Sequence, residues 1–164
     1  MSGIKVFLSH KNEDSEVAGA IAYRLKIHHQ IDVYLGVIDR NMEKNGPDLA
    51  DYIRAEMEKC TQLLAVISAK TRESQWVPWE IGVATEKERP LASFINPPAT
   101  IPEFLRKWPY LQSQEDVDRY ASVSKSTRLV QEESVRRATA SASSARRTAF
   151  REFHRSLKAQ LGQR

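Results

Sequence analysis

The chain has 164 residues, of which 41% are hydrophobic, and a formal net charge of +4. This length suffices for one domain with a proper core, and no run reaches the roughly 18 consecutive apolar residues of a membrane-spanning helix. The single cysteine, Cys60, excludes an internal disulfide and suits a reducing cytoplasm, where we expect the protein to be. A strand pattern begins almost at the N-terminus, so no signal peptide is expected. One cysteine and four histidines give no zinc-ligand spacing, and we expect no metal and no membrane partner.

Apolar periodicity predicts strands that alternate with helices. The expected strands are 4–9, 31–35, 63–68, 91–95 and a short one that ends at 111. The expected helices are 14–27, one from 48 to near 60, one from near 78 to 87, a helical turn at 104–108, and 113–122. This alternation predicts a parallel, doubly wound α/β sheet of about five strands.

Two polar segments leave strands that a flavodoxin-like order would bring together. Ser9 and His10 end the first strand, and residues 68–80 follow the third. In that order the first strand lies between the second and the third, and ligands bind at the switch point between the first and the third. Both segments would then border one crevice.

The segment Ser74-Gln75-Trp76-Val77-Pro78-Trp79-Glu80 is the most informative part of the chain. Proline is favoured at the first helical position, so Pro78 predicts a helix start that places the Glu80 carboxylate in the first turn. Trp76 and Trp79 offer flat apolar surface for a ring, and a partly desolvated glutamate gains basicity.

This segment resembles the strand-to-helix signature of TIR (Toll/interleukin-1 receptor) domains, a Ser followed by Trp-Cys-x-x-Glu. Trp76, Val77 and Glu80 fall on its Trp, Cys and Glu, and valine is a common departure among bacterial members. Residues 5–14 resemble the family's first-strand box, and residues 39–53 resemble its loop and helix after the second strand. These boxes lie in the family's order over roughly residues 4–124. The chain thus resembles stand-alone bacterial TIR proteins of Thoeris-like antiphage systems.

The resemblance implies an enzyme that cleaves NAD as its substrate and needs no cofactor. In TIR domains that cleave NAD, a glutamate at the position of Glu80 contacts the ribose attached to nicotinamide. A carboxylate there stabilises the oxocarbenium-like cation that forms when the N-glycosidic bond breaks. The product would be ADP-ribose, a cyclic ADP-ribose or another ADP-ribose-derived signal, read by a separate effector protein. The alternative is a non-catalytic adaptor that acts by TIR–TIR association and needs no acid at this position.

Four residues near the expected crevice have both a functional and a structural interpretation. Glu80 either acts on the substrate or complements the helix dipole. Ser9 and His10 are candidate substrate-binding residues, although His10 equally suits bracing of the neighbouring loops. Asp14 either holds substrate hydroxyls or caps the following helix.

The aromatic and loop candidates also have both a functional and a structural interpretation. Trp76 and Trp79 either stack on a base or cover the sheet edge. Asp39 is a further candidate for substrate binding, and with Arg40 and Lys44 it lies in the loop that resembles the family's lid and self-association surface. A cation there suits a diphosphate, and a solvated loop charge is the alternative.

The sequence motifs of other catalytic classes are absent from the chain. The chain has no Gly-x-Gly-x-x-Gly, no Walker lysine loop and no Gly-x-Ser-x-Gly. Binding of NAD without a Rossmann fingerprint fits a dinucleotide that is consumed.

The C-terminal part differs in composition, so we divide the chain into a TIR domain at 1–124 and a basic helical tail at 125–164. The tail carries ten Lys/Arg and three Asp/Glu, a charge of +7, and the remaining 15 and 18 leave −3 for the rest. We expect one or two helices around a flexible Ser/Ala stretch near 139–145, with an apolar stripe at Phe150, Phe153, Leu157 and Leu161 that docks on its own domain or on another copy. A nucleic-acid role is disfavoured because most of the tail lacks aromatic residues for stacking.

Overall fold

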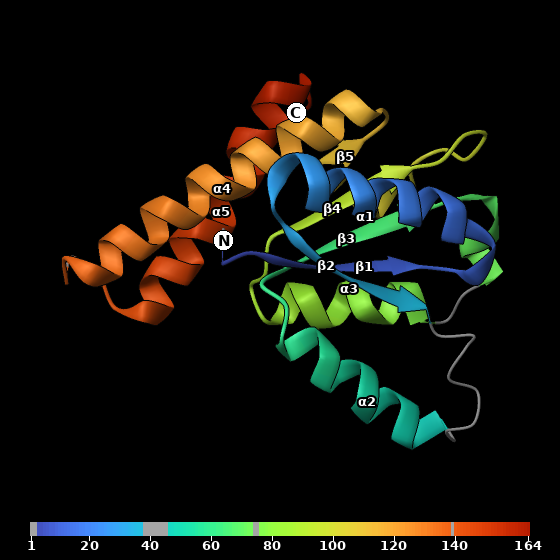
Figure 1. Ribbon diagram of the computed structural model, residues 1–164, viewed down its shortest axis with the longest axis horizontal. Helices are drawn as coiled ribbons and strands as arrows, with labels where there is room; N and C mark the ends of the chain where they lie inside the picture. Colours follow the sequence, from blue (N-terminus) through green and yellow to red (C-terminus); the bar gives the residue numbers. More distant parts are fainter. Residues whose placement is uncertain (1–2, 38–45, 74–75, 139) are drawn as a thin grey trace.

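The computed structural model describes residues 3–37, 46–73, 76–138 and 140–164. Its strands are β1 (Lys5–His10), β2 (Asp32–Val37), β3 (Gln62–Ile67), β4 (Leu91–Ile95) and β5 (Tyr110–Leu111). They form one parallel sheet in the order β2-β1-β3-β4-β5 (Figure 1). The predicted five-stranded, doubly wound α/β fold with a flavodoxin-like strand order is therefore confirmed.

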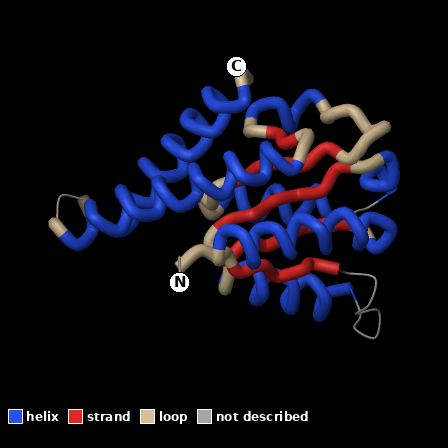
Figure 2. Tube along the Cα trace, turned by 45° about the horizontal axis from the view of Figure 1, so that its top comes forward, coloured by secondary structure: helices blue, strands red, loops and turns tan. Residues whose placement is uncertain are grey.

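Helices cover both faces of this sheet (Figure 2). They are α1 (Ser15–His29), α2 (Gly46–Glu58), α3 (Trp76–Glu86), α4 (Gln114–Arg136) and α5 (Ala142–Leu161), with short 3₁₀ segments at Asn12–Asp14, Ala69–Glu73 and Glu103–Lys107. Side chains of α1, α4 and α5 pack on one face of the sheet, and side chains of α2 and α3 pack on the other.

Alternation along each strand divides the apolar residues between two cores. Val6 and Leu8 of β1 point into the core under α1, α4 and α5, whereas Phe7 points into the core under α2 and α3. The middle strand β3 is buried throughout, as expected for a parallel strand with helices on both sides. Cys60 lies in the second core as predicted, and burial raises the pKa of its thiol to about 11, which makes it a poor nucleophile.

Helix α4 is longer than the sequence pattern predicts. It was expected to end at residue 122, but it continues to Arg136, because residues 123–136 contain neither Gly nor Pro and Val123 and Thr127 extend its buried side. Its N-terminus is as predicted, and the Ser113 hydroxyl accepts a hydrogen bond from the backbone N–H of Asp116. The predicted division at residue 124 therefore lies inside an unbroken helix.

Helix α5 packs into the main core. Phe153 and Leu157 of the predicted apolar stripe are fully buried, and the Phe153 ring meets the Tyr120 ring of α4 edge-on at 5.8 Å. Ser141 caps α5, so the helix begins inside the segment for which flexibility was expected. A separation of the chain into residues 1–124 and 125–164 stays a prediction, and a truncation that tests it is described in the Discussion.

None of the described helices is long and apolar enough to cross a bilayer. Within the same residues, no group of three or more His, Cys, Asp or Glu side chains is placed to hold a metal ion.

Candidate active site

A row of small residues crosses the sheet beneath α3. Gly36 of β2 pairs with Ser9 of β1, Ser9 pairs with Ala65 of β3, and Ala65 pairs with Ser93 of β4. A Cβ atom on Gly36 would lie only 2.6 Å from Cε1 of the Phe7 ring, so a larger residue there would displace that ring. Small side chains in this row leave room for a side chain that descends from α3.

Glu80 of α3 occupies this space. Its exposed fraction is 0%, and its Oε2 atom accepts a hydrogen bond from the Ser9 hydroxyl. Its Oε1 atom is buried and has no hydrogen-bond partner among the residues that the structure describes. Buried polar atoms are nearly always hydrogen-bonded, so this oxygen marks a position where a ligand group would be satisfied.

The surroundings of Glu80 favour its neutral form. Burial raises the pKa of Glu80 from its ordinary value of 4.5 to about 8, and the hydrogen bond from Ser9 opposes this shift to a smaller extent. With a pKa of about 8, the carboxyl group is largely protonated at neutral pH. A cation placed beside it would lower its pKa again and ionise it. Strongly perturbed carboxyl groups of this kind are concentrated at functional sites.

The position of Glu80 in its helix differs from the prediction. Helix α3 begins at Trp76 and not near Pro78, so Glu80 is the fifth residue of the helix and lies beyond its first turn. The earlier start is compatible with Pro78, because the first four N–H groups of a helix have no intrahelical acceptor. It also brings the Trp76 and Trp79 rings edge-on at 5.5 Å. The helix-dipole effect fades after the first turn. The interpretation that Glu80 only complements the helix dipole therefore loses support.

His10 ends β1 and Asp14 follows it, at the same end of the sheet as Glu80, but their side chains make other contacts. The buried His10 ring donates from Nδ1 to the Leu8 carbonyl oxygen at 2.9 Å, which braces the end of β1. Asp14 occupies the N-cap position of α1, yet its side chain makes no capping hydrogen bond. Its Oδ2 atom instead accepts from the Ser68 hydroxyl at 2.6 Å and so joins the ends of β1 and β3. Substrate contacts of both residues stay predictions.

The remaining predicted residues fall into two groups. Trp76 and Trp79 are half-buried and pack against the core under α3, which fits their structural interpretation, and stacking on a base stays a prediction. Asp39, Arg40 and Lys44 lie outside the described residues.

A largely apolar cavity of about 620 Å³ adjoins this group at the carboxyl ends of β3 and β4. Val77 and Ile81 of α3 flank it on one side, Ile101 and Phe104 line another part, and Ser68 contributes a hydroxyl. Its volume suits a small ligand. Glu80 is not among the described residues that line it, so the carboxyl group lies next to this cavity but is closed off from it.

Sequence reasoning missed two polar residues of the site. Ser93 is buried in the same row as Ser9, and its hydroxyl has no partner among the described residues. A single polar residue inside the apolar run 91–95 was the available signal. Ser68 was seen only as the end of a strand, and its bond with Asp14 depends on strand order, which the local pattern does not contain.

The raised pKa of Glu80 has a consequence for stability. Between about pH 6.5 and pH 8 the folded protein binds more protons at Glu80 than the unfolded chain does, so its free energy of unfolding should fall as the pH rises through this window, by up to about 1.4 kcal/mol per pH unit. Below this window burial of His154, which lowers the pKa of its imidazole to about 4, has the opposite effect. Glu80→Gln removes the titrating group and should abolish this slope. Urea unfolding across the window checks this, with Glu86→Gln, an exposed change in the same helix, as the control. Equal slopes for Glu80→Gln and the parent would contradict it.

Comparisons with known proteins agree with this architecture. The family model for the TIR domain matches residues 6–137. Among solved structures, a 2-deoxyribosyltransferase from the psychrotolerant bacterium Bacillus psychrosaccharolyticus superposes with a TM-score of 0.54 and 15% identity, covering 70% of this chain and 90% of that one. At this identity the likeness shows the fold alone. No curated protein sequence matches the chain. Because the family model spans most of the chain, from β1 to the end of α4, the chain belongs to the TIR domain family.

Proposed function

We propose that this TIR domain cleaves NAD between nicotinamide and ribose, with Glu80 as the catalytic residue. The observation that carries the proposal is the buried Glu80 carboxyl group, which has one oxygen held by Ser9 and the other without a partner among the described residues. Burying an acid in this way costs stability. A selected function at this position would account for that cost.

The arrangement suits the chemistry of the bond. When the bond between ribose C1′ and the nicotinamide nitrogen breaks, its electron pair goes to the nitrogen, nicotinamide leaves as a neutral molecule, and the ribose becomes an oxocarbenium-like cation. A carboxylate nearby stabilises that cation. The nicotinamide ring of NAD is itself cationic, so its approach would lower the pKa of Glu80 and ionise it. Ser9 would hold Oε2 and leave Oε1 free to face the ribose.

The fate of the cation depends on which nucleophile reaches it. Water gives ADP-ribose and a proton, an atom of the adenine ring gives a cyclic product, and another acceptor gives an adduct. We include in the proposal that the product is a signal for a separate effector protein in bacterial antiphage defence, in the cytoplasm. The support for this part is the resemblance to stand-alone bacterial TIR proteins, together with the lone buried Cys60.

One observation favours the alternative of an adaptor that acts by TIR–TIR association. Glu80 has an exposed fraction of 0% and is closed off from the neighbouring cavity, as expected in a domain that converts no substrate. Under the enzymatic proposal the same closure means that α3 or its surroundings must shift before the ribose can reach Oε1.

We expect this shift to be coupled to assembly, so that basal turnover is low and rises more than linearly with protein concentration. The segment 39–47 resembles the family's association segment, and a neighbouring copy bound there would favour the open site by binding it preferentially. Nicotinamide release from NAD, measured alongside light scattering over a wide range of protein concentration, checks this. Strictly linear dependence with full activity as a monomer would count against it.

A further inference from the structure

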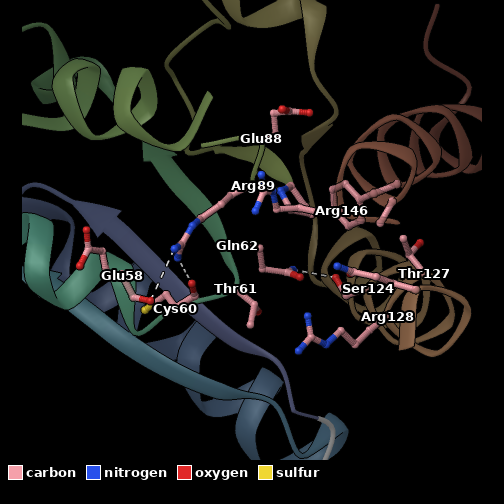
Figure 3. A pocket seen from close by; sticks show the side chains of 14 residues that line it. Glu58, Cys60, Thr61, Gln62, Glu88, Arg89, Ser124, Thr127, Arg128 and Arg146 are labelled. Carbon is pink, nitrogen blue, oxygen red and sulfur yellow. Dashed lines mark hydrogen bonds between the residues drawn. The ribbon is translucent and has the colours of Figure 1, made fainter. Parts of the chain in front are cut away.

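A second cavity, of about 280 Å³ and lined largely by polar and charged residues, is shown in Figure 3. The cavity lies at the opposite end of the sheet from Glu80, because it includes the first residue of β3, whereas Glu80 contacts Ser9 near the carboxyl end of β1. Its floor contains Gln62, the first residue of β3, and Pro90, which precedes β4. One wall is formed by Thr127 and Arg128 of α4, and another by Arg146 of α5. Since β3 begins at this cavity and ends beside Ser68, the two sites are separated by the length of the strand.

The cavity has an excess of unneutralised positive charge. Three arginines line it, Arg89, Arg128 and Arg146, together with Glu58 and Glu88. Both glutamates pair with cations that are not among the described lining residues: Glu58 with Lys87 at 2.8 Å and Glu88 with Arg147 at 3.5 Å. Arg128 pairs with Glu132 at 3.0 Å. Neither Arg89 nor Arg146 forms an ion pair with a residue that the structure describes, although the Glu58 carboxylate also attracts Arg89.

Arg89 is held rigidly in place. Its guanidinium group donates from Nη1 to the carbonyl oxygens of Met57, at 2.6 Å, and of Cys60. These bonds cap the end of α2 but leave the positive charge of Arg89 in place. Burial lowers the pKa of Arg89, the nearby Cys60 and Glu58 oppose this shift, and the charge of Arg146 adds a smaller lowering, because like charges repel.

Arg146 reaches from α5 toward Arg89 in Figure 3, and it has no hydrogen bond or ion pair within the described part of the chain. Thr127 and Gln131 of α4 also line the cavity, and their side chains likewise have no hydrogen-bond partner among the described residues. Two guanidinium groups and two uncommitted polar side chains thus surround one space. An anion with several acceptor oxygens would satisfy them together and relieve the repulsion.

We propose that this cavity binds the phosphate group of a small ligand, with Arg146 and Arg89 pairing with its oxygens and Thr127 donating a hydroxyl hydrogen bond. The volume lies near the lower limit of small-molecule pockets, about 300 Å³, so it suits a phosphorylated fragment or free phosphate and is too small for a dinucleotide. Because the lining comes from β3, α4 and α5, the bound phosphate would tie the α4–α5 helical pair to the sheet. The site is independent of NAD cleavage and of Glu80.

Titration calorimetry with ribose 5-phosphate and with inorganic phosphate, at constant ionic strength, tests the proposal on the full chain. We expect binding by the parent protein, and Arg146→Gln should weaken it on the order of tenfold or more, since charge-assisted hydrogen bonds are among the strongest. Arg151→Gln, an exposed position of α5 that is not among the described lining residues, changes the charge equally and should leave the affinity within about twofold. Tighter binding of ribose 5-phosphate would identify a phosphate monoester as the ligand, and equal binding would identify free phosphate.

A second readout does not depend on the calorimetric heats. Ribose 5-phosphate should slow amide hydrogen exchange around Thr127 and Arg146 in the parent and not in Arg146→Gln. The proposal is overturned if neither ligand binds below about 10 mM, or if Arg146→Gln and Arg151→Gln weaken binding equally.

Discussion

Replacing Glu80 by Gln should reduce nicotinamide release from NAD on the order of 100-fold or more while the protein stays folded. The amide keeps the shape of the side chain and still offers an oxygen to the Ser9 hydroxyl, but it cannot carry the negative charge that stabilises the ribosyl cation. The residue is fully buried and its pKa is raised, so the substitution also removes an ionisation that burial disfavours. We therefore expect Glu80→Gln to be at least as stable as the parent at pH 8.

The matched control is Glu86→Gln, which makes the same chemical change in the same helix at an exposed position. It should release nicotinamide at the parent rate. If Glu80→Gln, folded by circular dichroism, also keeps the parent rate, Glu80 is not the catalytic residue. If all three proteins are inactive but associate alike, the adaptor alternative is supported.

Phe153→Ala should destabilise the protein by about 3–5 kcal/mol, a large part of the stability of a typical domain. The ring is fully buried and meets the Tyr120 ring of α4 edge-on at 5.8 Å, so its removal leaves a cavity between α5, α4 and the sheet. Phe150→Ala, at a half-buried position of the same helix, is the control and should cost clearly less. Urea unfolding of the three proteins measures the difference, and equal midpoints for Phe153→Ala and the parent would show that α5 contributes little to the core.

Truncation after Ser124 extends this test to the predicted domain boundary. The sequence pattern predicts a soluble fragment, but the cut would pass through α4 and remove Phe153 and Leu157 from the core, so from the structure we expect an insoluble or unfolded fragment instead. A soluble fragment that unfolds cooperatively would instead support the division into residues 1–124 and 125–164.

The strands could be predicted because their apolar pattern is unambiguous, and their order was implied by the resemblance to TIR domains. The run 63–67 is apolar at every position, which fits a strand covered on both faces and little else of that length. Once β1 and β3 are neighbours, Ser9 and the segment after β3 must meet at one edge. The contact between Ser9 and Glu80 follows from this topology.

The length of α4 could not be predicted because its hydropathy pattern is reversed in its second half. Ser124 and Thr127 face the protein interior, whereas Leu129 and Val130 are 67% and 65% exposed. A prediction that places apolar residues on the buried side of a helix therefore ends this helix at residue 122. The reason lies in the neighbours: the buried Ser124 hydroxyl accepts from Gln62 of β3 at 2.8 Å.

The cavity lined by Arg89 and Arg146 could not be predicted from the sequence for a different reason. Arg89 precedes β4 and Arg146 belongs to α5, so only the packing of the α4–α5 pair on the sheet brings them to one space. In the sequence, Arg146 is one of many basic residues in a segment with a charge of +7, and nothing local distinguishes it from Arg151.

The central claim is tested most directly by mass spectrometry of the products formed from NAD. The parent protein, at concentrations where it self-associates, should convert NAD to nicotinamide and one ADP-ribose-derived product, linear, cyclic or attached to an acceptor. Glu80→Gln under the same conditions should leave NAD intact. Intact NAD with the self-associated parent protein, or the same products at the same rate from Glu80→Gln, would contradict the account.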